Sequence, residues 1–234
     1  MKWEIAAGAV EPLRVSRVTV SAACGRNAMH EIPKVFLVDD DPQLLRGLSR
    51  IFMQSGYSVE CFVSPLDAIE RASYDGPACF VVDLNMPQMS GLEFQEAVLK
   101  TGCRIPLLFL SGEGDIPTAV KALQRGALDF LVKPLSSERL LGAVAEAVDA
   151  HRKALAGRLE WQESQERFQR LSPRERQVAQ LVARGLLNKQ ISFELGLAER
   201  TVKLHRARIM TKLEVGSVAD LVRLMERLPP AGAA

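Results

Sequence analysis

Five short apolar runs alternate with amphipathic stretches between residues 34 and 150, and this alternation restricts the fold more than any other feature. Turn residues bound each run: 35–38, 57–62, 78–82, 106–110 and 129–132. The intervening stretches repeat apolar residues at the spacing of a helix, and the first of them contains Leu44, Leu45, Leu48, Ile51 and Phe52. Strands that alternate with helices predict an α/β fold with a five-stranded, doubly wound parallel sheet.

Polar residues stand at four of the five predicted strand ends. Asp39 and Asp40 follow the first run, Asp83 the third, Ser111 the fourth and Lys133 the fifth. In a parallel sheet these ends meet at one edge, where ligands bind. Three carboxylates at one place repel each other unless a hard cation lies among them, and ligation by oxygen alone favours Mg²⁺. A carboxylate can also accept a phosphoryl group, whose oxygens a lysine and a hydroxyl would hold.

Helix-capping residues indicate where further helices begin. Asp41 precedes Pro42 and is therefore expected to cap a helix rather than to bind a ligand. A capping box with proline at the first helical position, SPRE, begins at Ser172, and a second box begins at Ser217. Between them, Asn188 is expected to cap a helix of its own.

These signals predict an all-α domain of four short helices after the sheet domain. The linker between the two domains is charged and helix-permissive, so it is expected to continue the fifth helix. A coiled coil is not expected, because sustained heptads are absent. The N-terminal extension has no periodic apolar pattern, which indicates either disorder or a translation start at Met29. The expected segments are the extension, the sheet domain, the linker, the helical domain and a tail: residues 1–30, 31–150, 151–167, 168–228 and 229–234.

Charge is divided unequally between the two predicted domains. Residues 31–150 contain 10 Lys and Arg against 17 Asp and Glu, whereas residues 151–234 contain 16 against 9. A basic half suggests a polyanionic partner. Five cations and no acidic residue lie between Arg200 and Leu213. This segment is the second helix of a predicted helix-turn-helix pair, the position from which a helix enters the DNA major groove.

Several classes of protein are disfavoured by composition. The four cysteines have no metal-ligand spacing, and the three histidines lie far apart in the sequence. No apolar run approaches the roughly 18 residues of a membrane span. We therefore expect a cytoplasmic protein with no membrane partner and reduced, structural cysteines.

The motifs of the first half resemble the receiver domain of bacterial two-component response regulators. The resemblance rests on VFLVDDDP, VVDLNMPQMSGLEF, LLFLSGEGD and GALDFLVKP. It implies a CheY-like receiver fold in which Asp83 is the phospho-acceptor. The family pattern further implies magnesium ligands at Asp39, Asp40, Asp83 and the backbone carbonyl of Asn85.

The same resemblance implies a phosphorylation switch. Ser111 would bond the phosphoryl oxygens, Lys133 would pair with them, and Phe130 would report phosphorylation through its rotamer. A plain core role for Phe130 is the alternative. The family pattern also implies that the Lys133–Pro134 peptide bond is cis.

The sequence of the second half resembles the LuxR-type DNA-binding domain of the NarL/FixJ response regulators. The matching segment is LSPRERQVAQLVARGLLNKQISFELGLAERTVKLHRARIMTKL. The family geometry implies that base edges are faced by Lys203, Leu204 and Ala207. It implies that phosphates are held by Lys189, Thr201, Arg206 and Arg208. The last helix would pair two copies through Val218, Leu221 and Met225.

Two positions depart from the family pattern. Ala207 offers a base only an apolar contact, for instance with a thymine methyl group. Ala198 lacks the side-chain oxygen with which many relatives cap the recognition helix, a loss of about 1 kcal/mol.

Together these features predict a transcription regulator, and the family resemblance implies an activator. A sensor histidine kinase would phosphorylate Asp83, the face of the fourth helix and fifth strand would form a homodimer, and the dimer would bind double-stranded DNA and RNA polymerase. Apart from its own phosphoryl transfer and autodephosphorylation, the chain is not expected to be an enzyme. The alternatives are an aspartyl-phosphate phosphatase, disfavoured by the lack of an inserted substrate cap, and a regulator that works without phosphate.

Overall fold

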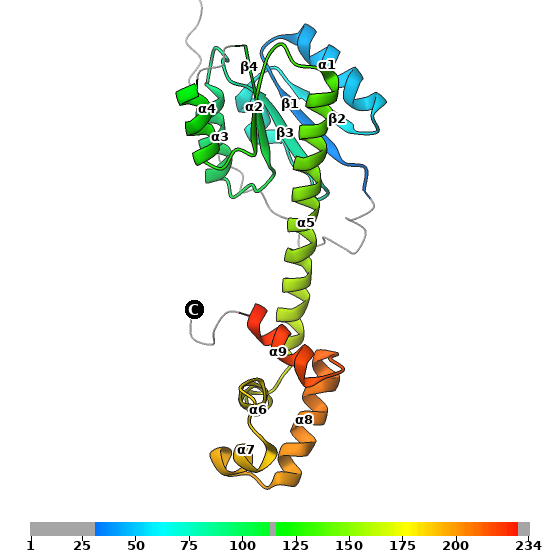
Figure 1. Cartoon of the computed structure of the whole chain (residues 1–234), viewed down its shortest axis with the longest axis vertical. Helices are drawn as coiled ribbons and strands as arrows, with labels where there is room; N and C mark the ends of the chain where they lie inside the picture. The colour runs from blue at the N-terminus through cyan, green and yellow to red at the C-terminus, as the bar shows by residue number, and fades with distance from the viewer. Residues whose placement is uncertain (1–30, 113–115, 229–234) are drawn as a thin grey trace, which may run out of the picture. The chain divides into compact units, whose positions relative to one another are not determined.

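The computed structural model describes residues 31–112 and 116–228 (Figure 1). The predicted extension, residues 1–30, and the predicted tail, residues 229–234, lie outside the described residues. The chain divides into two compact units, Met1–Arg152 and Lys153–Ala234, and each is described here by itself.

The first unit is built on one five-stranded parallel sheet, as the alternation of apolar runs predicts (Figure 1). The strand order is β2-β1-β3-β4-β5, and every neighbouring pair is parallel. The bounds are β1 Lys34–Val38, β2 Ser58–Phe62, β3 Ala78–Asp83, β4 Leu107–Ser111 and β5 Asp129–Val132. Strands β3 and β4 are buried along their whole length, which explains why they are apolar without alternation.

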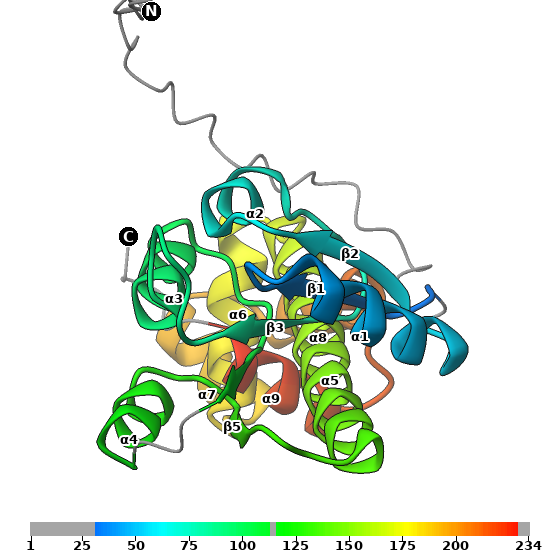
Figure 2. The same ribbon diagram turned by 90° about the horizontal axis from the view of Figure 1, so that it is seen from above.

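Helices cover both faces of this sheet (Figure 2). Helices α2 (Pro65–Arg71), α3 (Gly91–Lys100) and α4 (Ile116–Gln124) pack on one face, and α1 (Pro42–Gln54) and α5 (Ser137–Gln169) on the other. Successive strand residues point to opposite faces, so Phe80 joins the first core and Val81 the second. Each such buried side chain contributes about 1.5–3 kcal/mol.

Helix α5 is one continuous helix of 33 residues. It confirms the prediction that the linker continues the fifth helix. No helix within the described ranges is both long and apolar enough to cross a membrane.

In the first unit, α5 also carries the buried His151, whose Nδ1 accepts a hydrogen bond of 3.0 Å from the Ala78 N–H. Burial lowers the pKa of this imidazole, so His151 is neutral at pH 7.

The second unit contains four helices after α5 within the described residues, as predicted. They are α6 Pro173–Ala183, α7 Asn188–Leu195, α8 Glu199–Leu213 and α9 Val218–Arg227. Between α7 and α8 the chain turns at Gly196, whose φ of 63° lies in the left-handed region that glycine adopts without strain. A core that includes Val178, Ile191, Val202 and Leu213 joins these helices.

The caps are confirmed at three of the four predicted positions. Asp41 Oδ1 accepts from the Gln43 N–H at 2.7 Å, and Ser172 and Ser217 cap α6 and α9. The prediction for Asn188 is wrong. Asn188 is already inside the helix, and its Oδ1 accepts from Arg206.

The structure corrects part of the face through which α9 was predicted to pair two copies of the chain. Leu221 is 1% exposed and belongs to the core of this unit, so its predicted part in pairing two copies is wrong. Met225 is half-buried against the same core, and its part in pairing stays a prediction, as does that of Val218. Val218 alone among the three is exposed. Of the three residues of this apolar stripe, Leu221 is the one that the core of the unit buries.

Candidate phosphoryl-acceptor site and nucleic-acid interface

Three of the predicted site residues meet at the carboxyl edge of the sheet. Asp83 is the last residue of β3, Asp39 follows β1, and Lys133 follows β5. Lys133 Nζ lies 2.7 Å from Asp83 Oδ1 and 3.3 Å from Asp39 Oδ2. The two aspartates are only 8% and 5% exposed. A buried pair of carboxylates thus shares one cation, although 94 residues separate Asp39 from Lys133.

The pKa values at this edge reflect burial opposed by pairing. Burial raises the pKa of Asp39, while the Asp41 N–H and Lys133 act in the opposite direction. Burial by itself would lower the pKa of Lys133, but its hydrogen bond to Asp83 and the charges of both aspartates raise it above the ordinary value. Lys133 is therefore a fixed positive charge beside Asp83.

Backbone groups hold the second oxygen of Asp83 and the loop that follows it. The Asn85 N–H donates to Asp83 Oδ2 at 2.7 Å. The Gly91 N–H donates a hydrogen bond of 2.8 Å to the Leu84 carbonyl, and a Cβ at Gly91 would lie only 2.7 Å from the Asp83 carbonyl oxygen. Gly91 is thus a positioning residue that sequence reasoning missed. Its only signal was a glycine at a helix start within the motif around Asp83.

Ser111 and Phe130 lie on the neighbouring strands. Ser111 ends β4 and is fully buried, and its carbonyl accepts from the Lys133 N–H at 2.7 Å. The Lys133–Pro134 bond is cis, as the resemblance implies. Phe130 is half-buried, with its ring centroid 6.3 Å from that of Phe109. Its role as a switch and its role as a core residue both stay predictions.

The donor chemistry at this edge fits Mg²⁺. Asp39, Asp40, Asp83 and the Asn85 carbonyl offer oxygen alone, which is the preference of this cation. Asp40 is exposed, unlike the other two carboxylates. Among the described residues, no three acidic, histidine or cysteine side chains form one cluster, but Mg²⁺ is usually bound through only one or two carboxylates together with water and phosphate oxygens. The ammonium of Lys133 already lies between the two buried carboxylates, which shows that the edge accommodates positive charge.

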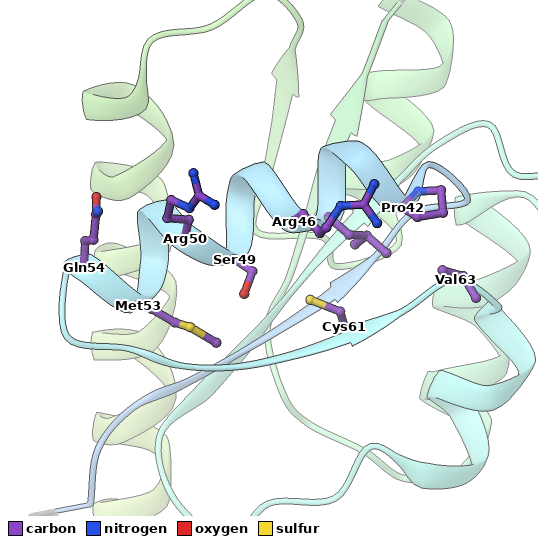
Figure 3. Close-up of a pocket in the computed structure, with 9 residues that line it drawn as sticks. Pro42, Arg46, Ser49, Arg50, Met53, Gln54, Cys61 and Val63 are labelled. Carbon is purple, nitrogen blue, oxygen red and sulfur yellow. The ribbon is translucent and has the colours of Figure 1, made fainter.

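A groove of about 520 Å³ runs along α1 and β2 (Figure 3). None of the predicted phosphoryl-site residues lines it. Arg46 and Arg50 of α1 extend along it, and Cys61 of β2 faces it. Burial raises the pKa of the Cys61 thiol, so this cysteine is protonated at neutral pH and not activated as a nucleophile. We assign this groove no part in phosphoryl transfer.

Helix α8 presents most of the predicted DNA-contacting residues to solvent. Its buried stripe is Val202, Ile209 and Leu213. The exposed positions include Lys203, Leu204, Ala207 and Arg208, while Thr201 is half-buried at the start of the helix and Lys189 is exposed on α7. No side-chain oxygen caps α8 at Ala198, in agreement with the departure noted in the sequence.

Two cations of α8 are tied within the unit. Arg206 Nη1 donates to Asn188 Oδ1 at 3.0 Å and so links α8 to the start of α7. Lys212 Nζ lies 2.7 Å from Glu175 Oε2, a carboxylate with a side-chain exposure of 4%. The hydrogen bond from Lys212 lowers the pKa of Glu175 to about 2. The number of basic residues in α8 therefore exceeds the number of positive charges that are free to bind DNA.

Comparison with known families and proteins agrees with both units. Residues 35–145 match the family model of the response regulator receiver domain, and residues 169–225 match that of the luxR family of bacterial regulatory proteins. Response regulator protein TodT of Pseudomonas putida is 43% identical over 194 residues, which cover 83% of this chain and 86% of TodT. Transcriptional regulatory protein FixJ of Bradyrhizobium diazoefficiens is 34% identical over 196 residues, which cover 82% of this chain and 94% of FixJ.

The solved structure of the response regulator StyR is similar along most of the chain. It has a TM-score of 0.77 and 40% sequence identity, and the match covers 85% of this chain and all of StyR.

Proposed function

The chain belongs to the response regulators that join a receiver domain to a LuxR-type DNA-binding domain, and we propose that phosphorylation of Asp83 controls its binding to promoter DNA. The family makes the chain a phosphorylation-dependent transcription regulator. The observation that carries the assignment to Asp83 is its place at the carboxyl end of β3, where it is buried and lies 2.7 Å from the ammonium of Lys133.

The donor in this proposal is a phosphohistidine of a sensor kinase. A carboxylate oxygen of Asp83 attacks the phosphorus, the P–O bond of an acyl phosphate forms, and the P–N bond to the histidine breaks. The Lys133 ammonium then forms an ion pair with a phosphoryl oxygen, and the Ser111 hydroxyl donates a hydrogen bond to another phosphoryl oxygen. Asp39, Asp40, Asp83 and the Asn85 carbonyl would hold Mg²⁺, which supplies neutralising charge when it is bound.

The output in this proposal is a homodimer formed through α4 and β5. This face exposes large apolar side chains, an arrangement that favours association. They are Ile116, Val120, Leu123, Leu128 and Val132. Two copies would place two α8 helices on the half-sites of one operator. Recruitment of RNA polymerase, and thus activation, is the simplest consequence.

We propose no enzymatic activity beyond the chain's own phosphoryl transfer and autodephosphorylation. A phosphatase of the aspartyl-phosphate type would need a substrate-binding segment over the strand ends. The described connections at that edge are short, as at residues 84–90 and 133–136. Attachment to a DNA-binding unit also favours a regulator.

The proposed control predicts that a small phosphodonor tightens DNA binding. With acetyl phosphate and Mg²⁺, we expect the Kd of the full chain for a promoter duplex to fall about tenfold. Asp83→Asn should bind at the level of the untreated parent under both conditions. Fluorescence anisotropy measures the Kd, and sedimentation of the same samples measures dimer formation. An equal gain in the variant would contradict control through Asp83.

A further inference from the structure

Strand β2 is an edge of the described sheet, at the opposite end of the strand order from β5. The Ser58 N–H and the Phe62 carbonyl both form hydrogen bonds on the β1 side. In a parallel ladder the backbone groups of successive residues point to alternate sides, so those of Val59 and Cys61 point to the outer edge. Backbone groups at such an edge are a template on which another strand can pair.

The groove of about 520 Å³ lies between this edge and α1 (Figure 3). Its two ends are apolar and open: Met53 of α1 is 57% exposed, and Val63, which follows β2, is 54% exposed. Arg46 and Arg50 lie between these ends along α1 (Figure 3). Along the groove the order of side chains is therefore apolar, cationic, cationic, apolar.

Both arginines of the groove are exposed, and neither forms an ion pair within residues 31–112 and 116–228. The sheet domain around them is acidic, because residues 31–150 contain 10 Lys and Arg against 17 Asp and Glu. Arg46 and Arg50 are thus a local positive exception. Complementary charge favours an anionic partner at this place.

The spacing of the two arginines matches that of an extended strand. Four positions on a helix correspond to about 6 Å along its axis. Alternate residues of a strand lie on one face about 6.6 Å apart. Two carboxylates at alternate positions of a strand in the groove could therefore each meet one arginine, and the next residues on the same face would meet Met53 and Val63.

We propose that α1 and β2 form a docking site for an extended acidic segment of a partner protein. The segment pairs with the β2 edge and places two alternate carboxylates on Arg46 and Arg50. A second copy of β2 is a poorer occupant, because it would bring its own arginine pair to the same edge and like charges repel. The site lies at the other edge of the sheet from β5, so a bound partner leaves the α4–β5 face free.

Two synthetic peptides of equal composition test this pattern. In Val-Thr-Glu-Thr-Glu-Thr-Val both carboxylates and both valines share one face of a strand, whereas in Val-Thr-Glu-Glu-Thr-Thr-Val one carboxylate moves to the other face. Binding to the full chain, labelled with ¹⁵N, is followed by NMR titration. We expect the first peptide to bind about fivefold more tightly, the scale of one exposed ion pair. Its largest shifts should fall on the amides of Val59 and Cys61.

Variants and modified peptides assign the contacts. The double variant Arg46→Gln/Arg50→Gln should bind both peptides equally weakly. The matched control is Arg71→Gln/Arg104→Gln, which removes two exposed charges outside the groove and should keep the preference. N-methylation of one alternate set of peptide amides should abolish binding, and that of the other set should not, because only one set faces β2.

The remaining outcomes overturn the docking site. No binding, equal binding of the two peptides to the parent, or a preference that persists in Arg46→Gln/Arg50→Gln would exclude recognition by the arginine pair. Binding that survives both N-methylations would exclude strand pairing. Shifts of Val59 and Cys61 that depend on protein concentration without peptide would identify a second copy of the chain as the occupant. All of these outcomes leave the proposed phosphorylation of Asp83 and the binding of DNA standing.

Discussion

Replacing Lys133 with methionine slows phosphorylation of Asp83 from acetyl phosphate by about 100-fold or more, the usual effect of removing one preorganised charge from a reacting centre. Methionine keeps the length and apolar stem of the side chain but removes the ammonium. That ammonium lies 2.7 Å from Asp83 and 3.3 Å from Asp39. Without it, two buried carboxylates face each other, and the incoming phosphoryl oxygens lose their cation.

Intact-protein mass spectrometry over a time course measures this rate. The matched control is Lys100→Met, which removes an exposed lysine whose ion pair with Glu96 lies on the surface of α3. The control should be phosphorylated at the parental rate. Circular dichroism establishes that Lys133→Met is folded. Labelling of folded Lys133→Met at the parental rate would show that the cation plays no part in the transfer.

The second large effect is expected in the DNA-binding unit, where Lys212→Met should lower the free energy of unfolding by about 2–4 kcal/mol. Glu175 has a side-chain exposure of 4%, and its Oε2 accepts from Lys212 at 2.7 Å. Removing the lysine leaves this carboxylate buried without its cation. The Ser172 N–H, which donates to the same oxygen at 2.8 Å, compensates only in part.

The Glu175 pair also gives this unit a pH dependence. The pKa of Glu175 is lowered from 4.5 to about 2 in the folded unit. The stabilisation is therefore fully present above pH 4.5 and is lost as the pH falls from 4.5 toward 2. Because Lys212 is the main cause of the lowered pKa, this loss should be smaller in Lys212→Met.

Hydrogen exchange measured by mass spectrometry resolves the two units of the full chain and therefore locates the effect. Protection of α6 and α8 should fall in Lys212→Met, while the strands of the receiver stay protected. Arg223→Met is the control, since its pair with Asp220 is exposed and should change stability by less than about 1 kcal/mol. Unchanged protection of α6 and α8 in Lys212→Met would mean that the pair contributes little.

Much of the receiver could be predicted because its signals are local or periodic. The apolar runs specify strands and helices, their alternation specifies a parallel sheet, and a parallel sheet brings the strand ends together. Asp83, Asp39 and Lys133 therefore meet although they lie far apart in sequence. The helix caps at Asp41 and Ser172 depend on neighbouring residues in the sequence and could be predicted equally well.

The errors arose where one pattern serves two partners. The stripe on α9 could face a second copy or its own unit, and packing places Leu221 in the core. Asn188 could cap its helix, but Arg206, 18 residues away, engages its oxygen. Lys212 was counted among the five cations of its segment, and tertiary contact pairs it with Glu175. A single sequence contains no signal for such distant pairings.

The most direct test of the central claim is the covalent state of Asp83 after incubation with acetyl phosphate and Mg²⁺. Intact mass followed by peptide mapping reports how many phosphoryl groups are added and where. The account predicts one phosphoryl group on the parent, located on the peptide that contains Asp83, and none on folded Asp83→Asn. Incorporation by Asp83→Asn equal to that of the parent would contradict the assignment of Asp83 as the acceptor.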